Sequence, residues 1–332
     1  GYCNMGFLIA GEVIQAVTDT TFDDYIKHHF FDPLNMQRTS STYEALLSAT
    51  NKCTPYTMFN GKLEKLAYDN LNNLAPAASI NSSVNDLSHW ALMQLSGGKY
   101  NGKQIVPADV LRNTQIPRSI AGAGTSRLYP SQHFSLYGLG WFLEDFEGKK
   151  TLSHSGGANG FVTNTLLIPE MQLGIIVLTN TDANGLYEAL CYQVLEAYVG
   201  LPYRNLSATY FSLYQPGTDE AIAQLKEWEK ITSKSPKPAL ALNKYAGKYS
   251  NPVYGDLAIA VDGNNLKVTF EQHPDLIGIL KPAGENKFIC YYNPLSWGVK
   301  EIPFTVENGE IKSVTITIND FIDFLPYEFV KQ

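Results

Sequence analysis

Two short segments carry residue types that could do chemistry, and they lie far apart in the sequence. The first is Tyr2-Cys3-Asn4, and the second is His154-Ser155-Gly156-Gly157. A tyrosine beside a helix N-cap most often serves packing, so the first segment alone is weak evidence of catalysis. In the second, the glycines let backbone N–H groups approach a ligand, and the histidine could orient or protonate it. An alternative of equal weight is a strand-end turn whose histidine is simply solvated.

Other patterns that carry chemistry are absent from the sequence. It contains no Gly-x-Ser-x-Gly elbow, no His-Glu-x-x-His and no Walker loop. Its four cysteines form no Cys-x-x-Cys pair and have no histidine at zinc spacing, so we expect neither a metal nor a cofactor. The net charge of −7 argues against nucleic acid and anionic membranes as partners. No run of about 20 apolar residues is available to span a bilayer.

The segments that must position these residues begin with helices. Apolar residues at helical spacing predict a helix over 5–17, with Asn4 as its N-cap, and a second helix after Thr21. Residues 39–82 show no sustained periodicity. They predict a long irregular excursion, and loops of that length often fold over an active site.

A further helix and a hairpin are predicted in the middle of the chain. Ser83 and Asp86 form a capping-box variant that starts a helix, and the following Gly-Gly pair ends it. Two runs rich in β-branched residues, 163–168 and 174–180, predict an antiparallel hairpin. A helix over 185–199 follows it.

The C-terminal part changes to a period of two. A bridge over 202–243 contains one polar helix near 218–232 and ends in a Ser/Lys/Pro-rich linker. From about residue 244, apolar residues alternate with polar ones on both sides of short Gly- and Asn-containing turns. This predicts an all-β domain, and closing it into a barrel would remove its sheet edges.

Five segments, taken in order, resemble the class C beta-lactamase-related serine hydrolases. They are Tyr-x-Asn (2–4), PAASINSSVNDLSHW (76–90), LMQLSGGKYNGKQIVP (92–107), YGLGW (137–141) and HSGGANGF (154–161). That family includes penicillin-binding proteins, D-amino-acid-specific peptidases and esterases. The tail over 244–332 resembles the lipocalin-like domain that often follows such catalytic domains. The resemblance implies an α+β fold, with a beta-lactamase/transpeptidase-like domain over 1–235, incomplete at its N-terminus, and a small antiparallel β-barrel over 236–332.

The resemblance also implies a role for each residue of the two motifs. In that family a Ser-x-x-Lys supplies the nucleophile and its partner base, a Tyr-x-Asn supplies a proton-shuttling phenol and a binding amide, and a Lys/His-Ser/Thr-Gly strand borders the site. By this resemblance Tyr2 is the general base and Asn4 binds substrate. His154, Ser155 and Gly156 correspond to the Lys/His-Ser/Thr-Gly strand, with Ser155 and Gly156 on the substrate side. The N–H of Gly157 would be an oxyanion donor.

The Ser-x-x-Lys motif that supplies the nucleophile has no counterpart in this sequence. The one serine with a lysine three residues later is Ser96, and it ends a helix before two glycines. The chemistry needs a serine at a helix N-terminus, where the dipole favours developing negative charge, so we reject Ser96. We therefore expect an N-terminally truncated serine hydrolase that is inactive alone. The complete protein would form an acyl-enzyme on a D-amino-acid peptide, amide or ester.

Two departures from the family pattern refine this expectation. Cys3 fills the middle of Tyr-x-Asn, where Ser or Ala is usual, and we expect it to be tolerated. His154 stands where true beta-lactamases have a lysine. A histidine is only partly charged near neutrality and holds a carboxylate less firmly, which favours an esterase or peptidase over a beta-lactamase.

Two other functions stay open, together with the questions of partners and compartment. The chain could be a non-catalytic relative that binds peptidoglycan-like peptides in the same cleft, or a barrel-based binding protein with an accessory helical half. We expect a periplasmic or secreted bacterial location. Tyr2 is expected beside the His154–Gly157 strand. The strand over 174–180 is expected to pair with a second copy in a homo-oligomer, a swapped segment or a missing N-terminal segment, unless a loop covers it.

Overall fold

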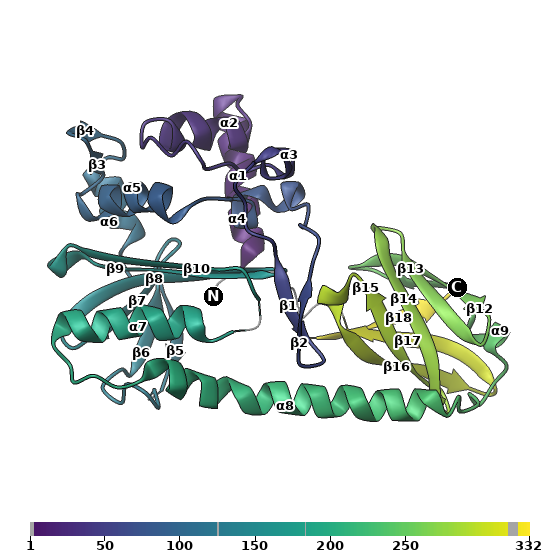
Figure 1. Cartoon of the computed structure of the whole chain (residues 1–332). Helices are drawn as coiled ribbons and strands as arrows, with labels where there is room; N and C mark the ends of the chain where they lie inside the picture. The colour runs from purple at the N-terminus through teal and green to yellow at the C-terminus, as the bar shows by residue number, and fades with distance from the viewer. Residues whose placement is uncertain (1–2, 125, 183, 318–324) are drawn as a thin grey trace. The chain divides into compact units, whose positions relative to one another are not determined.

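The computed structural model describes residues 3–124, 126–182, 184–317 and 325–332. These residues form two compact units, whose elements are labelled in Figure 1. The first unit contains Gly1–Pro55 and Ala67–Leu213, and the second contains Tyr56–Leu66 and Tyr214–Gln332. The expected boundary between sequence domains at residue 235 stays a prediction.

A six-stranded antiparallel sheet forms the centre of the first unit, in the order β10-β9-β8-β7-β6-β5. Leu152 and Leu167 pack against α5 (Val84–Leu95) on one face, whereas Leu166 and Ile168 pack against α7 (Leu186–Val199) on the other. Side chains alternate between the two faces because a strand has a period of two. Figure 1 shows the sheet between these two helices. The strands are β5 (Ser119–Ala123), β6 (Phe134–Tyr137), β7 (Phe142–Phe146), β8 (Lys149–Ala158), β9 (Phe161–Ile168) and β10 (Leu173–Thr179).

The predicted hairpin between β9 and β10 is confirmed. Ile168 pairs with Leu173 across a 3-10 turn over Pro169–Met171. β10 lies at the edge of the sheet, and among the described residues β9 is its one strand partner. The expected additional partner of residues 174–180 stays a prediction.

The first helix starts one residue earlier than predicted. Asn4 is the first residue of α1 (Asn4–Thr18), and Cys3 is the N-cap. The reason is a backbone hydrogen bond from the N–H of Gly6 to the carbonyl of Cys3, 3.1 Å long, which brings Cys3 into the cap position. The prediction that Asn4 caps this helix is therefore wrong.

Two helices of the first unit meet at a glycine. Gly11 is the one buried residue of α1, and it lies against Pro76 of α4 (Ala75–Ala78). A Cβ atom on Gly11 would be 2.2 Å from Cγ of Pro76. This close approach fixes where α1 crosses α4, and hence where the first turn of α1 lies.

The predicted cap of α5 is confirmed, and its Asp86 also binds the start of the long excursion. Ser83 accepts a hydrogen bond of 3.2 Å from the N–H of Asp86. The buried Asp86 carboxylate in turn accepts from the N–H of Arg38 at 2.7 Å and the hydroxyl of Thr39 at 2.8 Å. This network ties the start of the long excursion to the start of α5. The excursion itself contains only short elements, namely α3 (Tyr43–Ser48), β1 (Tyr56–Phe59), β2 (Lys62–Lys65), a 3-10 turn (Asn72–Leu74) and α4.

The remaining helical elements of the first unit are short. A π-helical turn over Lys27–Phe31 continues α2 (Phe22–Ile26). The Gly-Gly pair at 97–98, both at positive φ, ends α5 as predicted. A two-stranded ribbon and a helix then follow, namely β3 (Lys99–Tyr100), β4 (Lys103–Gln104) and α6 (Ala108–Thr114).

The polar helix predicted near 218–232 is longer than expected. Helix α8 runs over Leu206–Ser233 and continues through Pro216. Leu206 and Tyr210 are buried against Ala189 of α7, and this packing holds the N-terminal part of α8 in a helical conformation that its sequence does not signal. Tertiary burial here outweighs the unfavourable proline.

The second unit contains the expected closed barrel of eight antiparallel strands. Its interior is filled by side chains, with Tyr245, Tyr249 and Phe288 fully buried. The strands are β11 (Gly247–Asn251), β12 (Gly255–Asp262), β13 (Asn265–Phe270), β14 (His273–Gly284), β15 (Lys287–Asn293), β16 (Val299–Glu307), β17 (Glu310–Thr317) and β18 (Pro326–Lys331). Two short helices accompany them, α9 (Leu242–Tyr245) and a 3-10 turn (Leu295–Trp297). Over the described residues, none of the helices is long and apolar enough to cross a membrane.

Candidate functional site

The His-Ser-Gly-Gly motif lies where β8 extends past its neighbour β7. β7 pairs with β8 only as far as Ser153, whereas β9 pairs with β8 up to Ala158. The stretch from Ser155 to Gly157 is exposed and has a strand partner on one side only, within the part of the chain that the structure describes. Its second edge can therefore offer backbone N–H and carbonyl groups to an extended ligand.

Two hydrogen bonds to other described residues hold His154 in place. Its Nδ1 lies 2.7 Å from the carbonyl oxygen of Ser155, and its Nε2 lies 3.0 Å from the hydroxyl of Tyr137. A carbonyl oxygen only accepts, so Nδ1 carries a proton, and in the neutral ring Nε2 accepts from the Tyr137 hydroxyl. The ring also packs against Tyr137 and Phe142, with centroids 5.8 and 5.3 Å away. The alternative of a simply solvated histidine is therefore wrong.

Tyr137 is a site residue that sequence reasoning passed over. It is buried at the end of β6, and it begins the YGLGW segment that had served only to support the resemblance. The available signal was an aromatic hydroxyl preceding two glycines that permit a tight turn. Only the sheet brings it to His154, because β6 and β8 flank β7.

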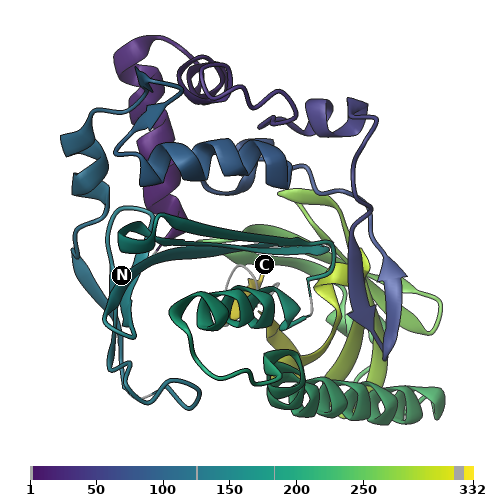
Figure 2. The same ribbon diagram turned by 60° about the vertical axis from the view of Figure 1, so that its left-hand side comes forward.

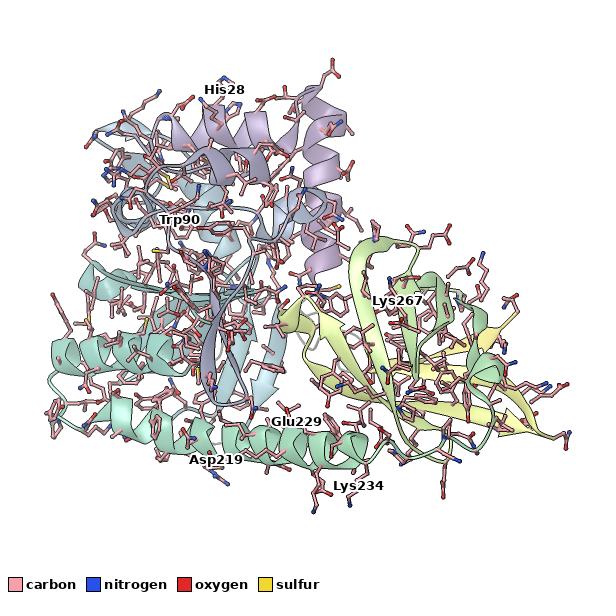
Figure 3. All side chains as sticks on the ribbon, turned by 45° about the vertical axis from the view of Figure 1, so that its right-hand side comes forward. His28, Trp90, Asp219, Glu229, Lys234 and Lys267 are labelled. Atoms are coloured by element: carbon pink, nitrogen blue, oxygen red, sulfur yellow. The ribbon has the colours of Figure 1, made fainter. Side chains whose placement is uncertain are left out.

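The loop that carries Tyr137 is rigidly supported. Trp141, which is 5% exposed, stacks on Trp90 of α5 at a centroid distance of 5.5 Å, and Figure 3 labels Trp90. The N–H of Gly138 donates to the carbonyl of Trp141 at 2.8 Å. A Cβ atom on Gly138 would be 2.4 Å from the carbonyl oxygen of Thr114, so only glycine fits there.

The start of α1 approaches the same loop. The ring of Phe7 lies 4.0 Å from where a Cβ atom of Gly140 would stand. Asn4 is exposed and lies one turn earlier on α1. Figures 1 and 2 show this end of α1 directed towards the sheet. The two motifs are thus linked through Phe7 and the YGLGW loop, while Tyr2 lies outside the described residues, and its place beside the His154–Gly157 strand stays a prediction.

Ser96 does not belong to this site. It is the C-cap of α5, with backbone angles φ −92° and ψ 22°. The ground for rejecting it as a nucleophile, its position at the C-terminal end of a helix, is confirmed. Over the described residues, no group of three or more His, Cys, Asp or Glu side chains is arranged to hold a metal ion.

The turn that closes β8 onto β9 is bound by two carboxylates. The buried N–H of Gly160 donates to Oδ2 of Asp182 at 2.9 Å. The backbone and the side chain of Asn159 face the carboxylate of Asp69, from the long excursion, and act to lower its pKa. Burial, together with the charge of Asp182, outweighs them and raises the pKa of Asp69 above its ordinary value. Sequence reasoning missed both carboxylates, since neither stands in a motif.

Comparison with known proteins places the chain in a family. A family model described as Beta-lactamase matches residues 1–200. The chain belongs to the beta-lactamase family. A second family model, described as a domain of unknown function (DUF3471), matches residues 232–331, which include the barrel. The expected α+β fold of a beta-lactamase-like unit with a closed antiparallel barrel is confirmed, and the lipocalin-like character of the barrel stays a prediction.

Several beta-lactamase-family relatives are longer than this chain. Unguisins hydrolase ungD of Aspergillus violaceofuscus is 26% identical over 295 residues, which cover 80% of this chain and 50% of the relative. Protein flp of Staphylococcus aureus is 28% identical over 189 residues, covering 55% of this chain and 33% of the relative. The chain spans about half the length of the first of these relatives, and less of the second.

A solved structure shares the fold. The octameric penicillin-binding protein homologue from Pyrococcus abyssi superposes with a TM-score of 0.54 at 18% identity. The match covers 100% of this chain and 63% of that one. At this identity the likeness concerns the fold alone.

Proposed function

We propose that this chain is part of a serine hydrolase that acts through an acyl-enzyme on a D-amino-acid peptide, amide or ester. The observation that carries the proposal is the one-sided stretch of β8 from Ser155 to Gly157, exposed next to a histidine fixed by Tyr137. An extended substrate can pair along such an edge. A backbone N–H aimed at the scissile carbonyl then stabilises the oxyanion that develops.

The roles of the motif residues follow the family resemblance. Gly157 N–H would be the oxyanion donor, and His154, bonded to Tyr137, would orient the substrate or the proton-transfer chain. Ser155, Gly156 and Asn4 would bind the substrate. Tyr2 would act as general base, which requires a nearby cation to lower the pKa of its phenol.

The nucleophile itself is proposed to come from a polypeptide segment that precedes residue 1. Two surfaces of the first unit support this. Along α1 the residues Met5, Ile9, Val13 and Val17, each four apart, are 58%, 57%, 53% and 75% exposed. Among the described residues, β10 has a strand partner on one of its two edges only. An apolar helix stripe and an unpaired strand edge favour cover by another helix and another strand.

Acylation of the protein tests this proposal. The 332-residue chain and a polypeptide extended to the start of its reading frame are treated separately with a fluorophosphonate or penicillin and analysed by intact mass spectrometry. We expect one adduct, on a serine of the extension, and none on the shorter chain. Hydrolysis of D- and L-amino-acid p-nitroanilides by the extended polypeptide should favour the D form.

Two variants of the extended polypeptide sharpen the test. Tyr137→Phe removes the hydroxyl that holds His154, and we expect a loss of about tenfold in kcat/KM, the size of one hydrogen bond. Tyr203→Phe, an exposed tyrosine elsewhere on the first unit, is the matched control and should change nothing. Saturable binding of a D-Ala-D-Ala peptide without any adduct would favour the non-catalytic relative, and neither binding nor adduct would overturn the proposal. Peptidoglycan-like substrates would also imply the periplasmic or secreted location, which we include in the proposal.

A further inference from the structure

The turn between β8 and β9 has an unexpected geometry. It consists of Asn159 and Gly160, and an Asn-Gly pair normally adopts a hairpin turn with both residues at positive φ. Here Gly160 has a φ of +81°, whereas Asn159 is not among the residues at positive φ. The turn therefore departs from the form that its sequence prefers, and something else must stabilise it.

Two carboxylates from different loops supply that stabilisation. Asp182, on the connection between β10 and α7, takes the buried N–H of Gly160. The carboxylate of Asp69, from the excursion before α5, faces the backbone N–H and the side-chain amide of Asn159. Both residues of the turn thus face carboxylates that lie outside the hairpin.

The charged form of Asp69 is itself disfavoured in the folded state, although the residue faces the turn that it would stabilise. The charged group that faces its carboxylate is Asp182, of like sign, and burial raises its pKa further. A carboxyl group with a raised pKa in the folded state favours folding in its protonated form, so its contribution is lost as the pH rises through that pKa. A residue whose ionised form lowers the stability of the fold is expected where function requires that residue.

We propose that Asp69 and Asp182 are positioning residues, which fix the Asn159-Gly160 turn and thereby aim the N–H of Gly157 along the exposed edge of β8. Gly157 lies on β8, two residues before Asn159 of the turn, so a change in the turn is expected to rotate its peptide group. The consequence for hydrolysis rests on the proposed function. The positional effect does not, and it can be measured in the 332-residue chain.

Glycine-selective amide NMR tests the proposal on that chain. Asp69→Ala removes the acceptor, so the resonances of Gly157 and Gly160 should both move. Asp182→Ala should accelerate amide exchange at Gly160 about tenfold or more, because it removes a hydrogen bond to a charged group. Asp145→Asn, an exposed carboxylate on β7 of the same sheet, is the matched control and should leave both resonances in place.

A pH titration separates positioning from a merely structural role. In the wild-type chain the Gly157 resonance should follow an inflection above the ordinary range of an aspartate, since the pKa of Asp69 is raised. Asp69→Asn retains an acceptor oxygen but no charge, so it should keep the resonance near its wild-type position at neutral pH and abolish this inflection. This variant decides the question if Asp69→Ala does not fold.

The outcomes also separate the two proposals. An unmoved Gly157 resonance in Asp69→Ala, or an unchanged inflection in Asp69→Asn, would overturn the positioning role. If the NMR results are as expected but the extended polypeptide gives no acyl adduct, the turn is positioned as proposed and the hydrolase function is wrong.

Discussion

The contact between Gly11 of α1 and Pro76 of α4 gives a prediction whose sign can be worked out. Helix propensity alone would make Gly11→Ala stabilising by about 1 kcal/mol. In the structure, however, the new Cβ would lie 2.2 Å from Cγ and 2.7 Å from Cβ of Pro76. A proline ring is tied to the backbone and cannot rotate away, and overpacking of this kind costs about 1–3 kcal/mol. We expect the free energy of unfolding of the first unit to fall by up to about 2 kcal/mol, the difference between these two effects.

The same helix offers a matched control. A Cβ atom on Gly6 would meet nothing within 4 Å, so Gly6→Ala should be neutral or stabilising by up to about 1 kcal/mol. Urea-dependent hydrogen exchange, read by mass spectrometry on peptides from α1 and α5, follows the first unit separately from the barrel. Gly11→Ala combined with Pro76→Ala should recover part of the loss, because the two substitutions share one contact.

This reasoning is refuted if the two glycine substitutions change stability in the same direction. If Gly11→Ala and Gly6→Ala shift the unfolding midpoint in the same direction, α1 does not cross α4 at Gly11. The placement of the first turn of α1 next to the YGLGW loop would then lose its main support, and with it the link between the two motifs.

Three further predictions concern stability, cysteine chemistry and assembly. Arg204→Ala should lower the free energy of unfolding by about 2–3 kcal/mol in urea, because the 1%-exposed Glu196 loses an ion-pair partner that is itself 41% exposed. Arg127→Ala, at an exposed arginine, is the control and should have no measurable effect. At pH 8 a thiol reagent should modify only the two exposed cysteines of the folded chain, Cys3 and Cys53, whereas in urea it should modify all four. The reason is that burial raises the pKa of both Cys191 and Cys290 to about 12, and the reactive thiolate forms only near or above that pH. Rapid labelling of either buried thiol in the folded chain would contradict this. Light scattering should find the 36.8 kDa chain self-associated through the open edge of β10. The extended polypeptide should not associate through this edge. A monomer with fast amide exchange at Ile175 to Leu178 would show instead that the edge is left open.

The sequence by itself determined the elements whose signals are local. The cap at Ser83, the hairpin around Pro169–Met171 and the alternating strands of the barrel all follow from neighbouring residues, and each is present. The motif order determined the family in the same way, since it needs no distances. The first half of α8 could not be predicted, because its helical conformation depends on the burial of Leu206 and Tyr210 against α7, a contact between segments that the sequence separates.

Only the tertiary structure decided how the site is supported. Tyr137 reaches His154 because β6 and β8 are neighbours of the same strand, and strand order is not written in either segment. Asp69 and Asp182 reach the Asn159-Gly160 turn from loops on either side of α5 and β8 in the sequence. A single carboxylate in a loop gives no sequence signal, because its meaning depends on which buried N–H groups the fold brings within hydrogen-bonding distance.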